Sequence, residues 1–183
     1  MLDLLQELFA LNGTAHLYPL VWLFAVGILL YELPKRQELV CGRVEERWYP
    51  FNAILLVLPL ILWAGFRGYI GDTYAYRGHF NGAPATLSEL LPTLNADTKD
   101  PGFMVLTTLI KMLGVSDYRV FFLLIATFQM LCIALTFRKY SSNYWISMFL
   151  FVVSTDYLSW MFNGMRQFIA TVMIFAAFDL MVK

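Results

Sequence analysis

The sequence predicts an all-α, polytopic integral membrane protein with about five transmembrane helices and a short interfacial or re-entrant helix after a long external loop. Three observations support this prediction. Hydrophobic residues make up 60% of the 183 residues, charged residues only 14%, and long apolar stretches recur along the chain. A soluble domain is about 45–50% apolar and, at this size, buries only about 70% of its unfolded surface. The composition therefore excludes an ordinary soluble protein.

Charge and cysteine content exclude further classes. The 13 basic residues balance the 13 acidic residues, so the chain lacks the basic surface with which proteins bind nucleic acid. Cys41 and Cys132 are the only cysteines, which excludes a secreted disulfide scaffold. His16 and His79 stand alone, without Cys or carboxylate at ligand spacing, so no metal site is expected. There is no P-loop, and no cofactor is expected.

The chain is expected to form a single transmembrane domain over residues 1–183. Residues 1–16 place Leu4, Leu5, Leu8 and Leu11 on one helical face, which predicts an interfacial helix. Apolar stretches that approach or reach the roughly 17–25 residues needed to cross a bilayer follow it. The predicted spans are residues 17–33, 51–66, 120–137, 144–160 and 165–182.

Residues 103–115 decide the sidedness of the chain. They are apolar, contain Lys111 and include Gly114 near their end. At about 1.5 Å per residue such a helix reaches roughly 20 Å, which is short of the ~30 Å hydrocarbon core. We therefore expect a half-helix that does not cross the membrane and that follows an external loop over residues 67–102.

The distribution of basic residues follows from this assignment. Cytoplasmic loops of membrane proteins are enriched in lysine and arginine. If the half-helix does not cross, two compact loops with six basic residues lie on the cytoplasmic side: Lys35, Arg36, Arg43, Arg47, Arg138 and Lys139. The loop 67–102 and the turn 163–167 then share the external face. If it does cross, these two polar regions lie on opposite sides.

Arg67 stands on the external face in a setting that suits a functional site. It is followed by two glycines, which permit tight backbone turns. Asp72 and Thr73 suit a helix start, and Tyr76 lies four residues after Asp72, on the same face if that stretch is helical.

Arg166 lies in the first turn of the last predicted helix, where Asn163 is expected to be the N-cap. A cation there faces the positive end of the helix dipole, which is unfavourable by about 0.3–1 kcal/mol. An arginine at a helix start nevertheless binds phosphate or carboxylate well. Asp156 is one candidate partner and a ligand phosphate is the other. In the alternative reading, Arg67 and Arg166 contact lipid headgroups.

Taken together, these blocks resemble the EpsG family, which is related to Wzy-type O-antigen and exopolysaccharide polymerases. The matching blocks are Arg67 with Gly71-Asp72-Thr73 and Tyr76, Asp100-Pro101-Gly102-Phe103, and Asn163-Gly164-Met165-Arg166-Gln167. The family usually has an aromatic where Thr73 stands and more often Glu where Asp100 stands. Its members are generally nearly twice as long, so the chain is expected to be an N-terminal half.

The resemblance implies polymerisation of lipid-linked oligosaccharide repeat units at the outer face of the cytoplasmic (inner) membrane by a multi-pass protein. An acceptor sugar hydroxyl would attack the anomeric carbon of a donor glycan carried on polyprenyl pyrophosphate. The implied residues are Arg67, Arg166, Tyr76, Asn163 and Gln167 for substrate and pyrophosphate, with Asp72 and Asp100 as competing proton acceptors.

Two other functions remain open from the sequence. The chain could be a non-catalytic, flippase-like component that uses the same arginines to hold a lipid carrier, or an inactive fragment. The expected partners are polyprenyl-pyrophosphate-linked oligosaccharide, membrane lipids and other polysaccharide-assembly proteins.

Overall fold

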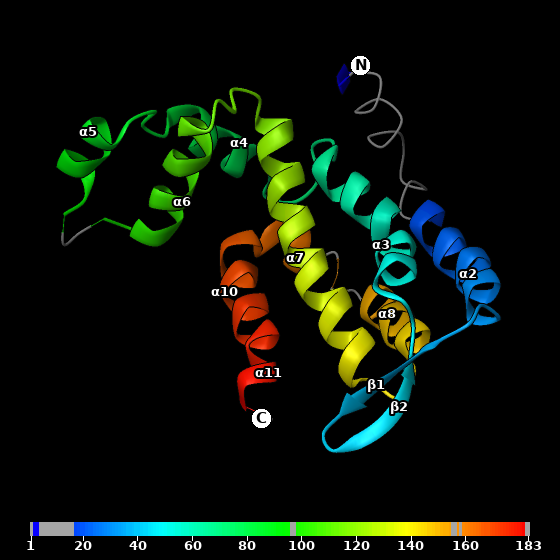
Figure 1. Cartoon of the computed structure of the whole chain (residues 1–183). Helices are drawn as coiled ribbons and strands as arrows, with labels where there is room; N and C mark the ends of the chain where they lie inside the picture. The colour runs from blue at the N-terminus through cyan, green and yellow to red at the C-terminus, as the bar shows by residue number, and fades with distance from the viewer. Residues whose placement is uncertain (1, 4–16, 96–97, 155–156, 158, 182–183) are drawn as a thin grey trace.

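The computed structural model of the chain describes residues 2–3, 17–95, 98–154, 157 and 159–181. These residues are mostly helical (Figure 1). In chain order the elements are α2 (Leu17–Tyr31), β1 (Arg36–Val40), β2 (Arg43–Arg47), α3 (Pro50–Gly65), α4 (Thr73–Gly82), α5 (Leu87–Leu90), the 3₁₀ turn η1 (Leu91–Thr93), α6 (Pro101–Met112), α7 (Tyr118–Tyr140), α8 (Tyr144–Val153), the π-helical turn η2 (Ser159–Asn163), α10 (Met165–Ala176) and α11 (Phe178–Met181). The interfacial helix expected over residues 1–16 lies almost wholly outside the described residues.

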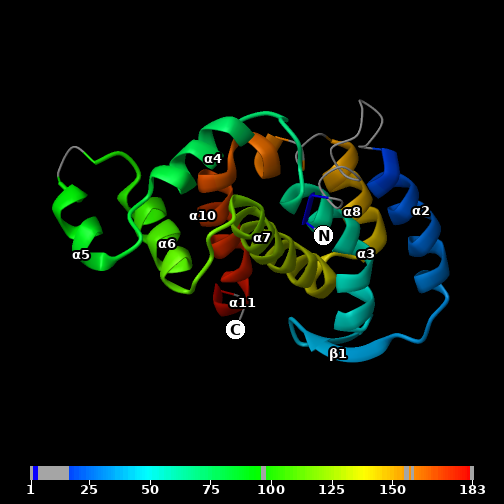
Figure 2. The same ribbon diagram turned by 90° about the horizontal axis from the view of Figure 1, so that it is seen from above.

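The long helix α7 is the centre of the bundle. It lies between α3 and α10 (Figure 2). α2 packs against α3, and α8 packs against both α2 and α7. Fully buried apolar side chains fill the space between these helices, among them Leu56 and Leu60 of α3, Met130 of α7 and Val172 of α10. This core joins segments that are far apart in the sequence.

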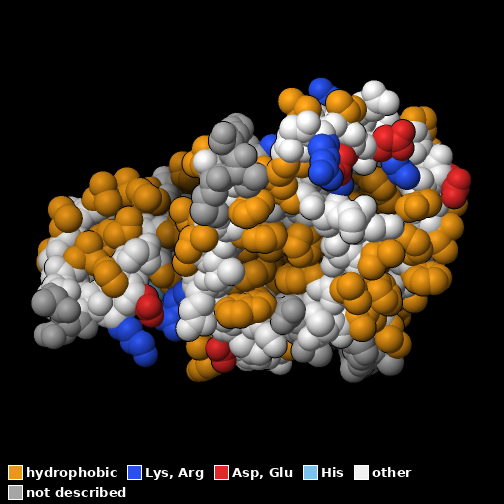
Figure 3. Space-filling view, turned by 90° about the horizontal axis from the view of Figure 1, so that it is seen from below, with side chains coloured by type: hydrophobic (Ala, Val, Ile, Leu, Met, Phe, Trp, Pro, Cys, Tyr) orange, Lys and Arg blue, Asp and Glu red, His pale blue; other side chains and the backbone are white. Residues whose placement is uncertain are grey.

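Among the described helices, only α7 is long and apolar enough to cross a membrane, with 23 residues. The other four predicted spans correspond to shorter apolar helices of 10 to 16 residues. Large apolar side chains remain exposed on several of them, including Leu29, Leu150 and Ile174. Seen from below, apolar side chains cover much of the molecule, and charged ones gather in a few clusters (Figure 3). Exposed apolar surface of this extent is typical of contact with lipid or a partner.

The span expected over residues 144–160 is shorter than predicted. Its α-helix ends at Val153. The π-helical turn η2 begins at Ser159, and in it the Gly164 nitrogen donates to the Ser159 carbonyl at 2.9 Å. The hydroxyl of buried Tyr157 donates to the Leu60 carbonyl at 2.5 Å, which ties this segment to α3. Asp156, expected as a partner of Arg166, lies outside the described residues.

The loop after α2 contains an antiparallel hairpin, so the all-α prediction was incomplete. β1 pairs with β2 from Arg36 opposite Arg47 to Val40 opposite Arg43. Cys41 and Gly42 connect the strands with φ of 49° and 77°, the positive values that a two-residue type I′ turn requires.

The predicted external loop 67–102 is also more ordered than expected, because it contains α4, α5 and η1. With α6 these elements form a lobe beside the N-terminal end of α7 (Figure 1). A second apolar cluster, which includes Phe80, Phe103 and Phe121, joins α4 and α6 to α7. The short helix expected over residues 103–115 is present as α6, which has 12 residues.

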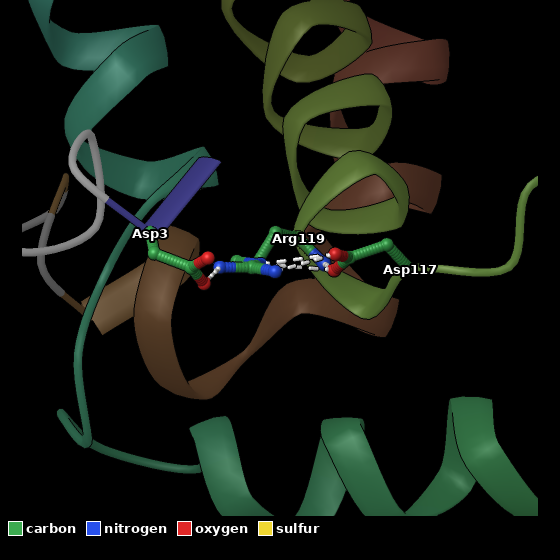
Figure 4. Close-up of polar contacts among 3 residues, drawn as sticks. All are labelled: Asp3, Asp117 and Arg119. Carbon is green, nitrogen blue, oxygen red and sulfur yellow. Dashed lines mark hydrogen bonds and ion pairs between the residues drawn. The ribbon is translucent and has the colours of Figure 1, made fainter. Parts of the chain in front are cut away.

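The start of α7 is fixed by ion pairs. The Asp117 carboxylate accepts a hydrogen bond from the Arg119 backbone nitrogen at 2.8 Å and caps the helix. The Arg119 side chain lies between Asp117 and Asp3 and pairs with both (Figure 4). The lobe and this cap occupy one end of the bundle, and the hairpin occupies the other (Figure 1).

Candidate functional site

The two arginine blocks that the sequence singled out meet at the lobe end of the bundle. The Asp72 backbone nitrogen donates to the Phe162 carbonyl at 3.3 Å. The Tyr76 hydroxyl donates to the Asn163 carbonyl at 2.9 Å. These two bonds join segments about 90 residues apart and hold the start of α4 against the turn η2.

Gly71 makes this close approach feasible. Its φ is +55°, a left-handed conformation that side chains rarely adopt. A Cβ atom added there would lie 2.0 Å from the Asn163 Oδ1 atom and 3.2 Å from the Phe162 carbonyl oxygen. Only glycine fits between the turn before α4 and η2 without a displacement of either segment.

Arg67 lies beneath this contact and is almost completely buried, with 1% of its surface exposed. Its Nη1 atom donates to the Met161 carbonyl at 2.5 Å, and its guanidinium lies 4.3 Å from the Phe122 ring centroid and 5.3 Å from that of Phe162. Its Nε and Nη2 atoms have no hydrogen-bond partner within the described residues. Burial lowers the pKa of Arg67 to about 10, so the side chain remains charged at neutral pH.

Arg166 is the second residue of α10, as predicted, and is more open. Its side chain is 38% exposed and pairs with the Asp100 carboxylate, and its guanidinium carbon lies 5.8 Å from the Tyr76 ring centroid. Asp100 is the N-cap of α6, with a left-handed φ of 57°. The ion pair therefore links the lobe to α10.

A cavity of about 200 Å³ opens beside Arg166, and it is lined by Asp72, Ala75, Tyr76, His79, Phe103 and Arg166. The Asp72 carboxylate makes no capping bond to α4 within the described chain, so it is available to the cavity. Arg67 and Asp100, although adjacent, are not among the lining residues. The cavity thus combines one guanidinium, one carboxylate, one phenol and one imidazole.

Two further residues of the predicted site, Asn163 and Gln167, do not line the cavity. Gly164, not Asn163, occupies the N-cap position of α10, because Asn163 ends the π-helical turn and its carbonyl accepts from Tyr76. Gln167 is exposed and does not line the cavity.

Sequence reasoning missed His79 and Gln129. His79 was treated as isolated, but its i, i+4, i+7 spacing with Asp72 and Tyr76 puts the three on one face of α4. The buried Gln129 donates from Nε2 to the Met165 carbonyl at 2.9 Å and supports the start of α10 from α7. No sequence pattern pointed to Gln129, which lies within an apolar span.

Comparison with curated proteins and with solved structures gives no match. Residues 51–183 match the EpsG family. The matched region includes both arginine blocks, the Asp100 block and every residue that lines the cavity. The match covers well over half of the sequence, and the chain therefore belongs to the EpsG family.

Proposed function

We propose that this protein is a membrane polysaccharide polymerase that transfers a glycan from polyprenyl pyrophosphate to the hydroxyl of an acceptor sugar. Membership of the EpsG family and the apolar helices indicate a membrane protein with a polymerase-type role. The observation that supports the specific reaction is the shared cavity, where the Arg166 guanidinium and the Asp72 carboxylate face the same space.

The proposed reaction breaks one C–O bond and forms another. The acceptor hydroxyl oxygen attacks the anomeric carbon, and the pyrophosphate leaves with the bonding electron pair. Arg166 can stabilise the negative charge that develops on the leaving group, because a guanidinium binds phosphate oxygens through two parallel hydrogen bonds. A nearby base, for which Asp72 and Asp100 are candidates, takes the hydroxyl proton.

The Asp100–Arg166 pair then acts as the substrate-free state of the pyrophosphate site. The cavity, at about 200 Å³, is smaller than the roughly 300–1,000 Å³ typical of ligand sites. We propose that pyrophosphate replaces the Asp100 carboxylate on Arg166 and that the lobe moves away from α10. This exchange frees the guanidinium and enlarges the cavity together.

Arg67 does not line the cavity, but its positive charge can stabilise an anion bound there without direct contact. It is buried behind Tyr76 and Asp72, and both lie close enough to influence its ionisation. In a low-dielectric setting a fixed positive charge stabilises an anion bound nearby. Tyr76 can contact the sugar from the cavity wall, whereas Asn163 and Gln167 do not line the cavity.

The polarity of the bundle supports an arrangement across the inner membrane. The hairpin and the last turn of α7 lie at one end of the bundle, and α4 lies toward the other (Figure 1). The first end carries five lysine and arginine side chains, Arg36, Arg43, Arg47, Arg138 and Lys139, and the cavity is lined mainly from the α4 end. With the basic end in the cytoplasm, the cavity faces outward. A multi-pass arrangement in the inner membrane then lets lipid-linked repeat units reach the cavity from the outer leaflet.

Elongation by the purified full-length protein tests the proposal. The substrate is the cell's own lipid-linked repeat unit, extracted from a strain that lacks the gene. We expect longer glycans with the wild type and a loss of about 10²–10³-fold with Arg166→Lys, which keeps the charge but loses the two-pronged bond. The matched control is Arg77→Lys on α4, whose guanidinium bonds the Tyr69 hydroxyl away from the cavity. Absence of elongation by the wild type, with retained binding of the lipid, would favour a lipid-carrier-binding component instead.

A further inference from the structure

His79 faces the cavity from the second turn of α4. It follows Tyr76 by three residues and Asp72 by seven, so all three lie on one face of the helix, and all three line the cavity. The imidazole centroid lies 4.9 Å from that of Phe103 on α6, with the two rings inclined by 33°. This contact fixes the ring at the interface between α4 and α6.

The Nε2 atom of His79 is buried and has no hydrogen-bond partner within the described part of the chain. An unpaired buried nitrogen destabilises a protein by about 1–3 kcal/mol. A packing role at this interface would be filled as well by an apolar residue, without that penalty. The unpaired nitrogen therefore points to a bond that forms only when substrate is present.

The surroundings of His79 favour the neutral form of its imidazole. Burial lowers the pKa of His79, and Arg166 of α10 and Lys111 of α6 lower it further, while Asp100 at the start of α6 opposes them. The remaining facing group, Asp72, belongs to its own helix. A neutral imidazole has a lone pair on one nitrogen and can accept a proton at pH 7.

The two carboxylates of the site are less suited to this task. Asp100 is held by Arg166, and in the proposed function it leaves when pyrophosphate binds. Asp72 lines the cavity, but a general base works best when its pKa is near the working pH. An imidazole, with an unperturbed pKa of about 6.5, is intrinsically a stronger base than a carboxylate, with an unperturbed pKa of about 3.9.

We propose that His79 is the general base of the transfer reaction, a role that rests on the proposed function and that deepens it. Its Nε2 atom takes the proton of the acceptor hydroxyl as the oxygen bonds to the anomeric carbon. The glycosidic C–O bond breaks, and its electron pair departs on the pyrophosphate beside Arg166. The imidazolium then returns its proton to the released pyrophosphate or to water. Asp72 is left to accept a hydrogen bond from a sugar hydroxyl.

The test compares His79→Gln with the wild type in the elongation assay as a function of pH. We expect the wild-type rate to fall on the acid side, below the pKa of His79, as the imidazole is protonated. His79→Gln should be about 10²–10⁴-fold slower at pH 7, without that acid limb and with KM little changed. Asn81→Ala, on the same helix but not lining the cavity, is the matched control and should behave as wild type.

A second variant separates chemistry from folding. In His79→Ala, added imidazole should restore part of the rate in a concentration-dependent way, which a structural role would not produce. If His79→Gln elongates at the wild-type rate with the same acid limb, or if Asp72→Asn alone removes that limb, His79 is not the base, although the proposed function stands. A wild-type protein that never elongates overturns both.

Discussion

At each end of the bundle, two arginines join segments that are distant in the sequence. The two ends differ in how many of the guanidinium nitrogens have hydrogen-bond partners. At the hairpin end, Arg138 donates to both carboxylate oxygens of Glu38 at 3.0 and 2.9 Å and to the Trp48 carbonyl at 2.8 Å. Arg47 donates to the Ser141 carbonyl at 2.5 Å and pairs with Glu45. Each leaves only Nε without a partner among the described residues.

At the cavity end, the same type of side chain is left incompletely bonded. Arg67 makes one hydrogen bond, to a carbonyl, and has two unused nitrogens within the described structure. Arg166 is held by a carboxylate that is itself 41% exposed. A hollow of similar size lies at each end, about 220 Å³ at the hairpin and 200 Å³ at the site. The number of bonded arginine nitrogens, and not the volume of the cavity, therefore distinguishes the hairpin end from the end that we propose binds a ligand.

The largest expected difference between the ends comes from replacing one buried arginine at each with methionine. In Arg67→Met, an apolar chain replaces a buried cation without a bonded carboxylate, which removes a desolvation penalty, but the Met161 carbonyl loses its donor. Because the two effects oppose each other, the free energy of unfolding should change by no more than about 1 kcal/mol. Elongation should fall about 100-fold or more because the site loses a fixed charge. Thermal unfolding in detergent, followed by tryptophan fluorescence, and the elongation assay measure the two effects.

Arg138→Met is the matched variant at the other end. It leaves Glu38 and the Trp48 carbonyl without their donor, so it should lower stability by about 1–3 kcal/mol. Elongation per folded molecule should stay near the wild-type value. If Arg67→Met destabilises the protein as much as Arg138→Met and leaves elongation intact, the two ends do not differ in the way proposed.

The difference between the ends was only partly predictable from the sequence. The association of the Arg67 and Arg166 blocks followed from the length of residues 103–115, and the shared face of Asp72 and Tyr76 followed from helical spacing. The Asp100–Arg166 pair could not be foreseen, because it depends on a left-handed residue that sets the direction of α6.

The hairpin and His79 were missed for different physical reasons. The hairpin strands carry many charged side chains and little alternation of apolar and polar residues, so only the Cys41-Gly42 turn gave a local signal. His79 was placed in a loop and treated as isolated, so its helical spacing with Asp72 and Tyr76 was not used. Its partner Phe103 comes from a segment more than 20 residues away, and such tertiary contacts have no local signature.

A smaller effect is expected from glycine substitutions, again with one at each end. Gly71 and Gly42 both have positive φ, but an added Cβ meets Asn163 at the former and nothing within 4 Å at the latter. Gly42→Ala should destabilise by about 1–2 kcal/mol from backbone strain alone. In Gly71→Ala the free energy of unfolding should fall by about 1–3 kcal/mol more, because the new methyl group clashes with Asn163. Elongation should also slow, because η2 and α4 move apart.

Equal losses of stability in the two alanine variants, measured by thermal unfolding, would show that the contact between Gly71 and Asn163 can relax freely. The additional variant Gly71→Ala/Asn163→Gly separates the terms, because it removes the Asn163 side chain that the new methyl group meets. It should recover part of the lost stability but not the part caused by the positive φ.

The smallest expected effect is a difference in how acid destabilises the two ends. Hydrogen bonds from Arg138 lower the pKa of Glu38 below its usual 4.5. The unfolded chain therefore binds a proton more readily than the folded one, and the stabilisation by this pair is complete above about pH 4.5 and is lost as pH falls through the folded pKa.

The same rule applies to His79 at a higher pH. Its folded pKa is lowered below the usual 6.5, so its contribution is complete above about pH 6.5 and is lost as pH falls through the folded value. Unfolding temperatures recorded from pH 8 to pH 4 should decline first in the His79 window and then in the Glu38 window. His79→Gln should flatten only the first decline and Glu38→Gln only the second. If one substitution flattened both declines, the two ends would unfold as a single acid-sensitive unit, and the prediction that they lose stability independently would be wrong.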